Sequence, residues 1–373
     1  MAIDLTKMPR LGFGLMRLPT NDGKIDLDRV CKMVDDYIAA GLNYFDTAYV
    51  YHGGDSEKAA KEAIVKRYPR DSFYLATKLP AWSLHTPDDR DRIFNEQCER
   101  AGVDYFDFYL LHSIEEGGNY DTYERLDCFE WGLQKKREGK IKHFGFSFHG
   151  TPALLEKLLD DHPEVEFVQI QLNYIDWDNP VISSGRLYEI LKERGIPMII
   201  MEPVKGGTLA SPPPEALAKF DAARKGATAA SWALRFVASL PGVMTILSGM
   251  SNEEQMKDNL NTFTNFEPLS VTEKQVIEDV KEIMHGKPTI GCTSCRYCCD
   301  GCPQGIKIPD IFSLINSVRI YNEGWRAKNY YNTHIAPSAK ASDCIGCGQC
   351  EGVCPQHLPI IELLRSAAQE LEG

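Results

Sequence analysis

Residues 27–78 read LDRVCKMVDDYIAAGLNYFDTAYVYHGGDSEKAAKEAIVKRYPRDSFYLATK. An amphipathic stretch over residues 27–40 ends at Gly41, a short aromatic run follows at 44–47, and the same alternation continues to the end of the segment. Short β-branched or aromatic runs that alternate with helical patterns are typical of a parallel sheet. This stretch therefore predicts consecutive strand-helix units.

The alternation extends over most of the chain. Eight runs have strand character: Leu11–Gly14, Tyr44–Thr47, Phe73–Thr77, Phe108–Leu111, His143–Ser147, Phe167–Gln171, Met198–Glu202 and Met244–Ser248. The helical patterns are Leu27–Ala40, Ser56–Val65, Pro87–Ala101, Tyr123–Glu138, Pro152–Leu159, Gly185–Arg194, Thr228–Ala238 and Thr272–Met284. Eight units, without a G-x-G-x-x-G turn at the first helix, favour a closed (β/α)8 TIM barrel over an open, doubly wound α/β sheet.

Composition limits the function classes. The 373 residues are 43% hydrophobic and 25% charged, as in soluble globular proteins, and the length suits one barrel of roughly 250 residues with a smaller appendage. The net charge of -12 opposes binding to nucleic acid. No run approaches the roughly 20 apolar residues of a membrane span. We expect a cytoplasmic protein that contacts neither nucleic acid nor membrane.

The cysteines divide the chain. Nine of the twelve lie between Cys292 and Cys354. Disulfide scaffolds belong to short secreted chains with little core, so reduced thiols are the better expectation here. The cysteine region begins just after the last helical pattern, which ends near Gly286 and Pro288. We predict a barrel domain over 1–287 and a second domain over 288–373.

Two cysteine runs have the same spacing. Each reads C-x2-C-x2-C-x3-C-P, from Cys292 to Pro303 and from Cys344 to Pro355. This is the spacing of bacterial ferredoxins, in which a tight loop wraps three thiolates around one 4Fe-4S cluster and the cysteine before proline reaches a second cluster. Zinc in four-cysteine sites is the competing interpretation. The predicted metal ligands are Cys292, Cys295, Cys298, Cys302, Cys344, Cys347, Cys350 and Cys354.

The ferredoxin rule implies that ligands cross between the two runs. One cluster then takes Cys292, Cys295, Cys298 and Cys354, and the other takes Cys344, Cys347, Cys350 and Cys302. Cys299 remains as a spare thiol. The 41 residues between the runs contain a helical pattern at Ile308–Tyr321. We therefore expect a small, mainly helical two-cluster ferredoxin-like domain.

Four reactive side chains fall at or just after the ends of neighbouring predicted strands. Asp46 ends the second strand, Tyr51 lies in the loop that follows, Lys78 ends the third strand and His112 ends the fourth. Catalytic groups of such barrels come from the C-terminal ends of strands. We expect these four residues to converge in one cleft.

These fragments resemble the aldo/keto reductase family. The matching motifs are FDTA at 45–48 with Tyr51, ATK at 76–78 and YLLH at 109–112, and the resemblance covers roughly residues 9–265. The motifs GFGLMRLP at 12–19 and GFSFHG at 145–150, together with the cluster region, resemble the ferredoxin-fused branch of that family.

The resemblance implies reduction of a carbonyl by hydride, or the reverse. The alkoxide that forms needs a proton donor, and a tyrosine with an ordinary pKa near 10 needs help at neutral pH. Tyr51 is the expected donor, Lys78 stabilises its phenolate, and Asp46 holds the lysine. In the family, the residue matching His112 orients the substrate oxygen. Each residue alone has a structural interpretation, as a helix cap, packing aromatic or buried histidine.

The cofactor residues follow from the same resemblance. Ser147, Gln169 and Asn259 match positions that hold a nicotinamide carboxamide and the adenosine end of the cofactor. Residues Ser248, Gly249, Met250 and Gln255 match the adenosine-phosphate loop. Gly249 and Gln255 stand where NADP-binding members have basic residues, which leaves NADP or NAD open. Arg17 and Lys205 are the candidates for the missing positive charge, and solvated surface charges are the alternative.

The combination gives three hypotheses. In the first, the barrel interconverts a small-molecule carbonyl and an alcohol, while the clusters relay electrons to a one-electron donor or acceptor protein or tune a flavin in the cleft. In the second, the chain is an electron carrier or redox sensor whose barrel is a partner-binding scaffold. In the third, the clusters are purely structural. The sequence does not specify the substrate or the oligomeric state.

Overall fold

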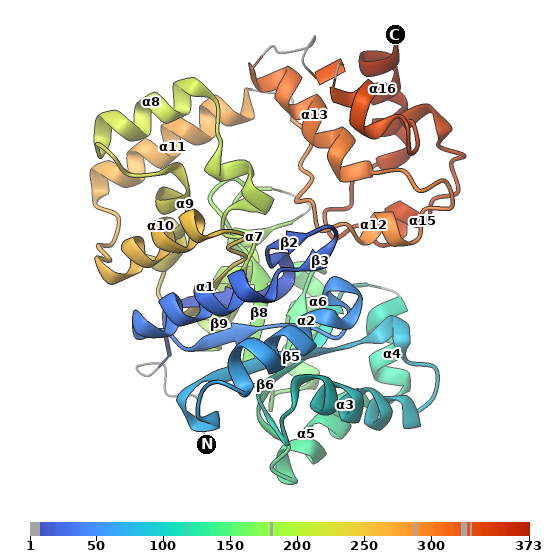
Figure 1. Ribbon diagram of the computed structural model, residues 1–373. Helices are drawn as coiled ribbons and strands as arrows, with labels where there is room; N and C mark the ends of the chain where they lie inside the picture. Colours follow the sequence, from blue (N-terminus) through green and yellow to red (C-terminus); the bar gives the residue numbers. More distant parts are fainter. Residues whose placement is uncertain (1–7, 117, 180–181, 287–288, 322–326, 329) are drawn as a thin grey trace. The chain divides into compact units, whose positions relative to one another are not determined.

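The structure is a computed structural model that describes residues 8–116, 118–179, 182–286, 289–321, 327–328 and 330–373. Eight parallel strands close into a barrel in the order β1-β10-β9-β8-β7-β6-β5-β4, which confirms the predicted (β/α)8 fold class (Figure 1). The barrel strands are β1 (Leu11–Gly14), β4 (Tyr44–Asp46), β5 (Tyr74–Pro80), β6 (Phe106–Ile114), β7 (Ile141–Phe148), β8 (Phe167–Gln171), β9 (Met198–Met201) and β10 (Val243–Ser248).

The helices alternate with these strands as predicted. They are α1 (Leu27–Ala39), α2 (Asp55–Ala60), α3 (Asp88–Ala101), α4 (Gly118–Arg125), α5 (Cys128–Arg137), α6 (Pro152–Asp161), α7 (Ser184–Glu193), α8 (Pro214–Ala223), α9 (Ala229–Ala238), α10 (Glu253–Thr264) and α11 (Val271–His285). Local signals fix their ends. Thr151 caps α6 by accepting a hydrogen bond from the Leu154 amide, and α3 ends at Gly102, whose φ of 70° suits a residue without a Cβ.

The helix predicted over Tyr123–Glu138 is wrong in one respect. The structure has two helices there, α4 and α5, because Asp127 adopts a left-handed conformation with φ 51°. The antiparallel pair β2 (Thr20–Asn21) and β3 (Lys24–Ile25) was not predicted, and neither were α8 and α10.

The chain forms two compact units. One comprises Met1–Pro203 with Ser231–Leu269, and the other comprises Val204–Ala230 with Ser270–Gly373. The predicted domain boundary between residues 287 and 288 lies outside the described residues, so it stays a prediction. In the part of the chain that the structure describes, no helix is both long and apolar enough to cross a membrane.

In the barrel unit, the core fills the space inside and around the strands. All nine residues of β6 are buried, which is expected for a parallel strand covered on both faces. One apolar cluster joins residues of six barrel strands and a residue that precedes the first strand. Its members are Met8, Tyr44, Ala76, Phe108, Leu110, Phe167, Ile199, Met244 and Leu247.

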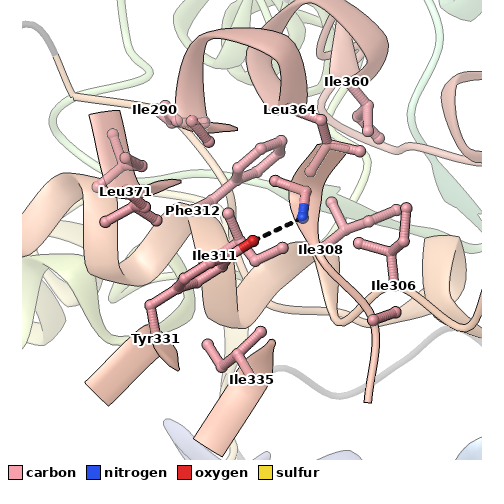
Figure 2. Packing of buried hydrophobic residues seen from close by; sticks show 14 of the residues in the cluster. Ile290, Ile306, Ile308, Ile311, Phe312, Tyr331, Ile335, Ile360, Leu364 and Leu371 are labelled. Carbon is pink, nitrogen blue, oxygen red and sulfur yellow. Dashed lines mark hydrogen bonds between the residues drawn. The ribbon is translucent and has the colours of Figure 1, made fainter. Parts of the chain in front are cut away.

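The second unit has its own core, shown in Figure 2. Its helices after α11 are α12 (Tyr297–Asp300), α13 (Ile308–Tyr321), α15 (Gln349–Gly352) and α16 (Ile360–Glu372). The buried side chains of Ile311, Phe312 and Leu364 pack in this core, and the Tyr331 hydroxyl accepts a hydrogen bond of 2.7 Å from the Ala341 amide. The helical pattern predicted over Ile308–Tyr321 is confirmed.

Candidate functional sites

Three neighbouring strands position the four predicted catalytic residues. Asp46 is the last residue of β4 and pairs in register with Ala76 of β5, while Lys78 and His112 extend from β5 and β6. Tyr51 begins the short helical segment Tyr51–Gly54 that follows β4. All four residues are buried, with 8% exposure or less. The barrel topology therefore gathers residues that are up to 66 positions apart in the sequence.

Lys78 is the centre of the group. Its Nζ donates hydrogen bonds of 2.5 Å to Asp46 Oδ1 and 2.7 Å to the Thr47 carbonyl, and it lies 5.0 Å from the centroid of the Tyr51 ring. The Tyr51 and His112 rings are 6.0 Å apart in an edge-to-face arrangement. The four predicted residues are thus brought together around one ammonium group.

Burial dominates the electrostatics of this group. It raises the pKa of the Asp46 carboxyl and lowers the pKa of the Lys78 ammonium, and the attraction between the two charges opposes both shifts. Burial also lowers the pKa of His112 well below its ordinary value, and the Lys78 charge lowers it further. His112 is therefore a neutral imidazole at pH 7.

Some buried polar atoms of the predicted site residues lack protein partners. Among the described residues, Asp46 Oδ2, His112 Nδ1 and Gln169 Oε1 are buried without a hydrogen-bond partner. A buried polar atom without a partner is costly, so such atoms mark places where a bound molecule supplies the missing bond. His112 and Gln169 are both predicted site residues, and their orphaned atoms fit a bound substrate and cofactor.

A buried polar network that was not predicted from the sequence contacts the backbone of Lys78. Glu57 accepts a 2.7 Å hydrogen bond from the Thr77 hydroxyl and one of 3.1 Å from Gln97 Nε2. Gln97 Nε2 also donates to the Lys78 carbonyl at 2.9 Å. All of these side chains are fully buried, and burial raises the pKa of Glu57. The signal available in the sequence was only an acidic residue six positions after Tyr51.

One aromatic residue beside the group was also missed. Trp82 lies in the short helical segment Ala81–Ser83 after β5, and its ring is 5.2 Å from the His112 ring. Its side chain is 46% exposed, which is unusual for a tryptophan. It therefore presents an apolar surface next to the buried imidazole.

The predicted cofactor residues lie in two places. Ser147 and Gln169 are neighbours in the β7–β8 register, the Ser147 hydroxyl accepts a 2.7 Å bond from the Ser113 amide, and Gln169 Nε2 contacts Met201 Sδ at 3.5 Å. After β10, Asn259 Nδ2 donates to the Ser248 hydroxyl at 2.6 Å. The structure thus brings together Ser147 with Gln169, as neighbours on adjacent strands, and Ser248 with Asn259, through a hydrogen bond.

Residues of the loop after β10 contact one another. Gln255 Oε1 accepts a 2.7 Å bond from the Ser251 amide, and Met250 is buried. A Cβ on Gly249 would lie 3.3 Å from the side chain of Arg17, so this arginine packs against the loop. The contact is made by the aliphatic part of Arg17, whose guanidinium lies 3.7 Å from Glu202 Oε1.

The cysteine runs line two cavities in the second unit. We call cavity 1 the one lined by Cys292, Cys295, Cys298 and Cys354, with Thr293, Arg296 and apolar residues including Phe312 and Ile360. Cavity 2 is lined by Cys302, Cys344, Cys347 and Cys350, with residues including Ile345, Gln349 and Leu364. Each cavity combines three cysteines of one run with the last cysteine of the other. This grouping matches the ligand crossing expected from the spacing.

The thiol arrangement fits clusters. All twelve cysteines lie in the described residues, and none of them forms a disulfide. The Ser294 amide donates to Cys292 Sγ at 3.4 Å, as amides do to cluster sulfurs. Cys299 lines neither cavity.

Comparisons with known proteins agree with this division. Residues 10–282 match the model of the aldo/keto reductase family, and residues 291–358 match that of the 4Fe-4S dicluster domain. L-galactose dehydrogenase from Arabidopsis thaliana is 26% identical over 297 residues, which are 74% of this chain and 91% of that protein. An aldo-keto reductase from Mycobacterium sp. (strain KMS) is 26% identical over 70% of this chain and 85% of its own length.

Solved structures show the same barrel. An aldo-keto reductase from Bacillus halodurans in its holo form aligns with a TM-score of 0.59 at 23% identity, over 73% of this chain and 92% of that one. An aldo/keto reductase from Klebsiella pneumoniae in complex with NADP and acetate aligns with a TM-score of 0.58 at 21% identity, over 74% and 92%.

The barrel, the buried group around Lys78 and the cysteine-lined cavities define an oxidoreductase with an iron-sulfur module. The chain belongs to the aldo/keto reductase family and carries a C-terminal 4Fe-4S dicluster ferredoxin domain.

Proposed function

We propose that the barrel interconverts a small-molecule aldehyde or ketone with its alcohol, with Tyr51 as the proton donor. One observation carries this proposal: the buried Lys78–Asp46 pair holds an ammonium 5.0 Å from the Tyr51 ring, beside His112. Carbonyl reduction places negative charge on the former carbonyl oxygen, which must receive a proton as the charge develops. The phenol of Tyr51 gives that proton.

The other members of the group prepare Tyr51. The Lys78 ammonium stabilises the phenolate that remains after proton transfer, and Asp46 with the Thr47 carbonyl keeps the ammonium in place. His112 is neutral, so it hydrogen-bonds the substrate oxygen without adding a charge. In the direction of alcohol oxidation, the Tyr51 phenolate accepts the proton of the alcohol.

A nicotinamide cofactor, when bound, supplies or accepts the hydride. Gln169 and Ser147 hold its carboxamide, and the orphaned Gln169 Oε1 supports this role. The residues that hold its adenosine end are Ser248, Gly249, Met250, Gln255 and Asn259. Arg17, whose aliphatic part packs against Gly249 and whose guanidinium pairs with Glu202, is the candidate contact for a phosphate of NADP, and NAD is the alternative.

The test compares Tyr51→Phe with Tyr49→Phe. Tyr49 is a matched control because its hydroxyl donates to Glu96 at 2.7 Å, away from Lys78. We expect Tyr51→Phe to lower kcat/KM about 10²- to 10⁴-fold and Tyr49→Phe to leave it nearly unchanged. The assay is anaerobic and uses NADPH and NADH with aliphatic and aromatic aldehydes, and NADP+ and NAD+ with L-galactose, since one relative is an L-galactose dehydrogenase. Equal activity in wild type and Tyr51→Phe would favour the electron-carrier hypothesis.

We also propose that two 4Fe-4S clusters occupy the cavities and exchange electrons with a one-electron carrier protein in the cytoplasm. The ligands are Cys292, Cys295, Cys298 and Cys354 in cavity 1, and Cys302, Cys344, Cys347 and Cys350 in cavity 2, which the two lining sets support. A cluster carries one electron at a time, while a nicotinamide carries a hydride, so an intermediary must connect them. A flavin in the cleft is one such intermediary.

Iron analysis and mass analysis of released small molecules test this part. Wild type and Cys299→Ser should each hold about eight iron atoms per chain, whereas Cys347→Ser should lose part of this iron. Cys299 is the matched control because it lines neither cavity. An undiminished rate of aldehyde reduction by NADPH after loss of the clusters would exclude a relay role. A released flavin would identify the intermediary.

A further inference from the structure

The segment that follows β9 has an unusual backbone. Lys205 has a φ of 48°, and the next two residues, Gly206 and Gly207, have φ values of 64° and 103°. A positive φ is strained for a residue with a Cβ, so the surroundings must impose it on Lys205. The Lys205 side chain is only 7% exposed, although lysine is rarely buried. Both features call for an explanation.

This segment lies directly against the first cysteine run, within the unit formed by Val204–Ala230 and Ser270–Gly373. A Cβ on Gly206 would be 2.2 Å from the Thr293 carbonyl oxygen, so only glycine fits there. Lys205 Nζ lies 3.9 Å from the position that a Cβ on Gly291 would take. Gly291 and Thr293 are the two neighbours of Cys292 in the sequence.

Cavity 1 shares residues of this cysteine run with the contact to the Lys205 segment. Thr293 lines cavity 1 together with Cys292 and Cys295, while its backbone touches Gly206. The Lys205 ammonium therefore lies close to Gly291, the residue that precedes the predicted cluster ligand Cys292. The one Lys or Arg among the described residues that line cavity 1 is Arg296, which forms an ion pair of 2.6 Å with Asp310. Among its described lining residues, cavity 2 has no Lys or Arg.

A buried cation next to one cluster affects the reduction potential of that cluster. Reduction adds one electron, and therefore one negative charge, to a 4Fe-4S cluster, with no bond formed or broken. A positive charge held nearby at low dielectric stabilises the reduced form more than the oxidised form, which raises the reduction potential. We propose that Lys205 selectively raises the reduction potential of the cluster bound by Cys292, Cys295, Cys298 and Cys354, an inference that rests on the two-cluster function proposed above.

The experiment is an anaerobic redox titration of the full-length holoprotein with dithionite as the one-electron reductant, followed by electron paramagnetic resonance. In Lys205→Gln we expect one of the two one-electron steps to move to lower potential by at least threefold in equilibrium constant, or roughly 28 mV at 59 mV per tenfold. The other step stays in place. Cys295→Ser should perturb the step that moves, and Cys347→Ser should perturb the other, which assigns each step to its cavity.

Matched variants separate charge from packing. Lys205→Arg keeps the charge and should keep both potentials, and Lys205→Met replaces Lys205→Gln if the latter does not accumulate. Lys219→Gln removes an exposed lysine of α8, which pairs with Asp279, and should change neither step. Unchanged potentials in both neutral variants, or equal shifts of both steps, would overturn the proposal.

A second measurement distinguishes an anion-binding role. If Lys205→Gln weakens NADPH binding but leaves both potentials unchanged, the lysine serves the cofactor and the proposal is wrong. Iron and sulfide analysis is done first on each variant. A wild type that does not bind two clusters would contradict the proposed two-cluster function itself. If two clusters are bound but neither reduction potential changes in Lys205→Gln, only the role of Lys205 is contradicted.

Discussion

His112 shows how one buried side chain couples the site to stability. Burial and the Lys78 charge keep its pKa well below the ordinary value in the folded protein, whereas the unfolded chain takes up a proton near pH 6.5. Below that pH the unfolded state binds one more proton than the folded state. Stability therefore falls as pH drops below 6.5, at a rate that approaches about 1.4 kcal/mol per pH unit while the pH stays above the folded pKa.

Replacing His112 removes this dependence. We expect His112→Gln to reduce the fall in the free energy of unfolding between pH 6.5 and 5.5 by about 1 kcal/mol relative to wild type. Urea unfolding at the two pH values measures it. His85→Gln, at an exposed histidine, should keep the wild-type slope. Equal slopes in His112→Gln and wild type would show that residue 112 is protonated in the folded state.

At the residue scale, the sequence predicted the parts of the site that have local motifs. Asp46 ends β4 and Tyr51 follows it, while Lys78 and His112 lie two residues before the ends of β5 and β6, and the barrel brings all four together. The support behind Lys78 was not predicted because Glu57 and Gln97 are 40 positions apart and nothing in the sequence marks either as buried. Burial of a polar side chain depends on tertiary packing, which a local pattern does not contain.

At the scale of elements, the strands were predictable because most of their residues are buried, so each contains a short run rich in apolar or aromatic residues. β1 and β8 have the predicted bounds, and β5 and β6 extend beyond them. The break at Asp127 was not visible because a left-handed aspartate carries no glycine or proline signal. For α10, the Asn252 side chain accepts a bond from the Gln255 amide, and this N-cap was the available signal.

The β7–β8 pairing contains a position where only glycine fits. A Cβ on Gly145 would lie 2.3 Å from the Phe167 carbonyl oxygen, and the two residues are in register. Gly145→Ala must push the strands apart, so we expect a loss of about 1–3 kcal/mol in the free energy of unfolding. Gly14→Ala in β1 is the control, since its nearest contact is 3.4 Å, and it should be neutral or stabilising by up to about 1 kcal/mol. Urea unfolding of both variants decides between these outcomes.

At the scale of the whole molecule, the chain combines a large barrel with a small module whose apolar core surrounds the cysteine cavities. Ile308 lines both cavities, Phe312 and Ile360 line cavity 1, and Leu364 lines cavity 2, while all four belong to the core of the second unit. The ligand sets inferred from the repeated spacing stay a prediction, and the last cysteine of each run lines the same cavity as the other run. The sequence singled out Lys205 only as a candidate contact for a phosphate, because the segment after β9 meets the cysteine run only in the folded chain.

Because the same side chains form the core and the cavity walls, we expect cluster binding to stabilise this module. Metal binding contributes directly to folding where the site does not exist in the unfolded chain. In Cys295→Ser/Cys347→Ser, amides of α13 and α16 should exchange with deuterium at least roughly tenfold faster than in the holoprotein, while amides of β6 keep their protection. Hydrogen-deuterium exchange with mass spectrometry measures both regions in one sample, and Cys299→Ser should behave as wild type. Unchanged protection in α13 and α16 would mean that the module folds without its clusters, so the thiolates would then serve electron transfer rather than stability.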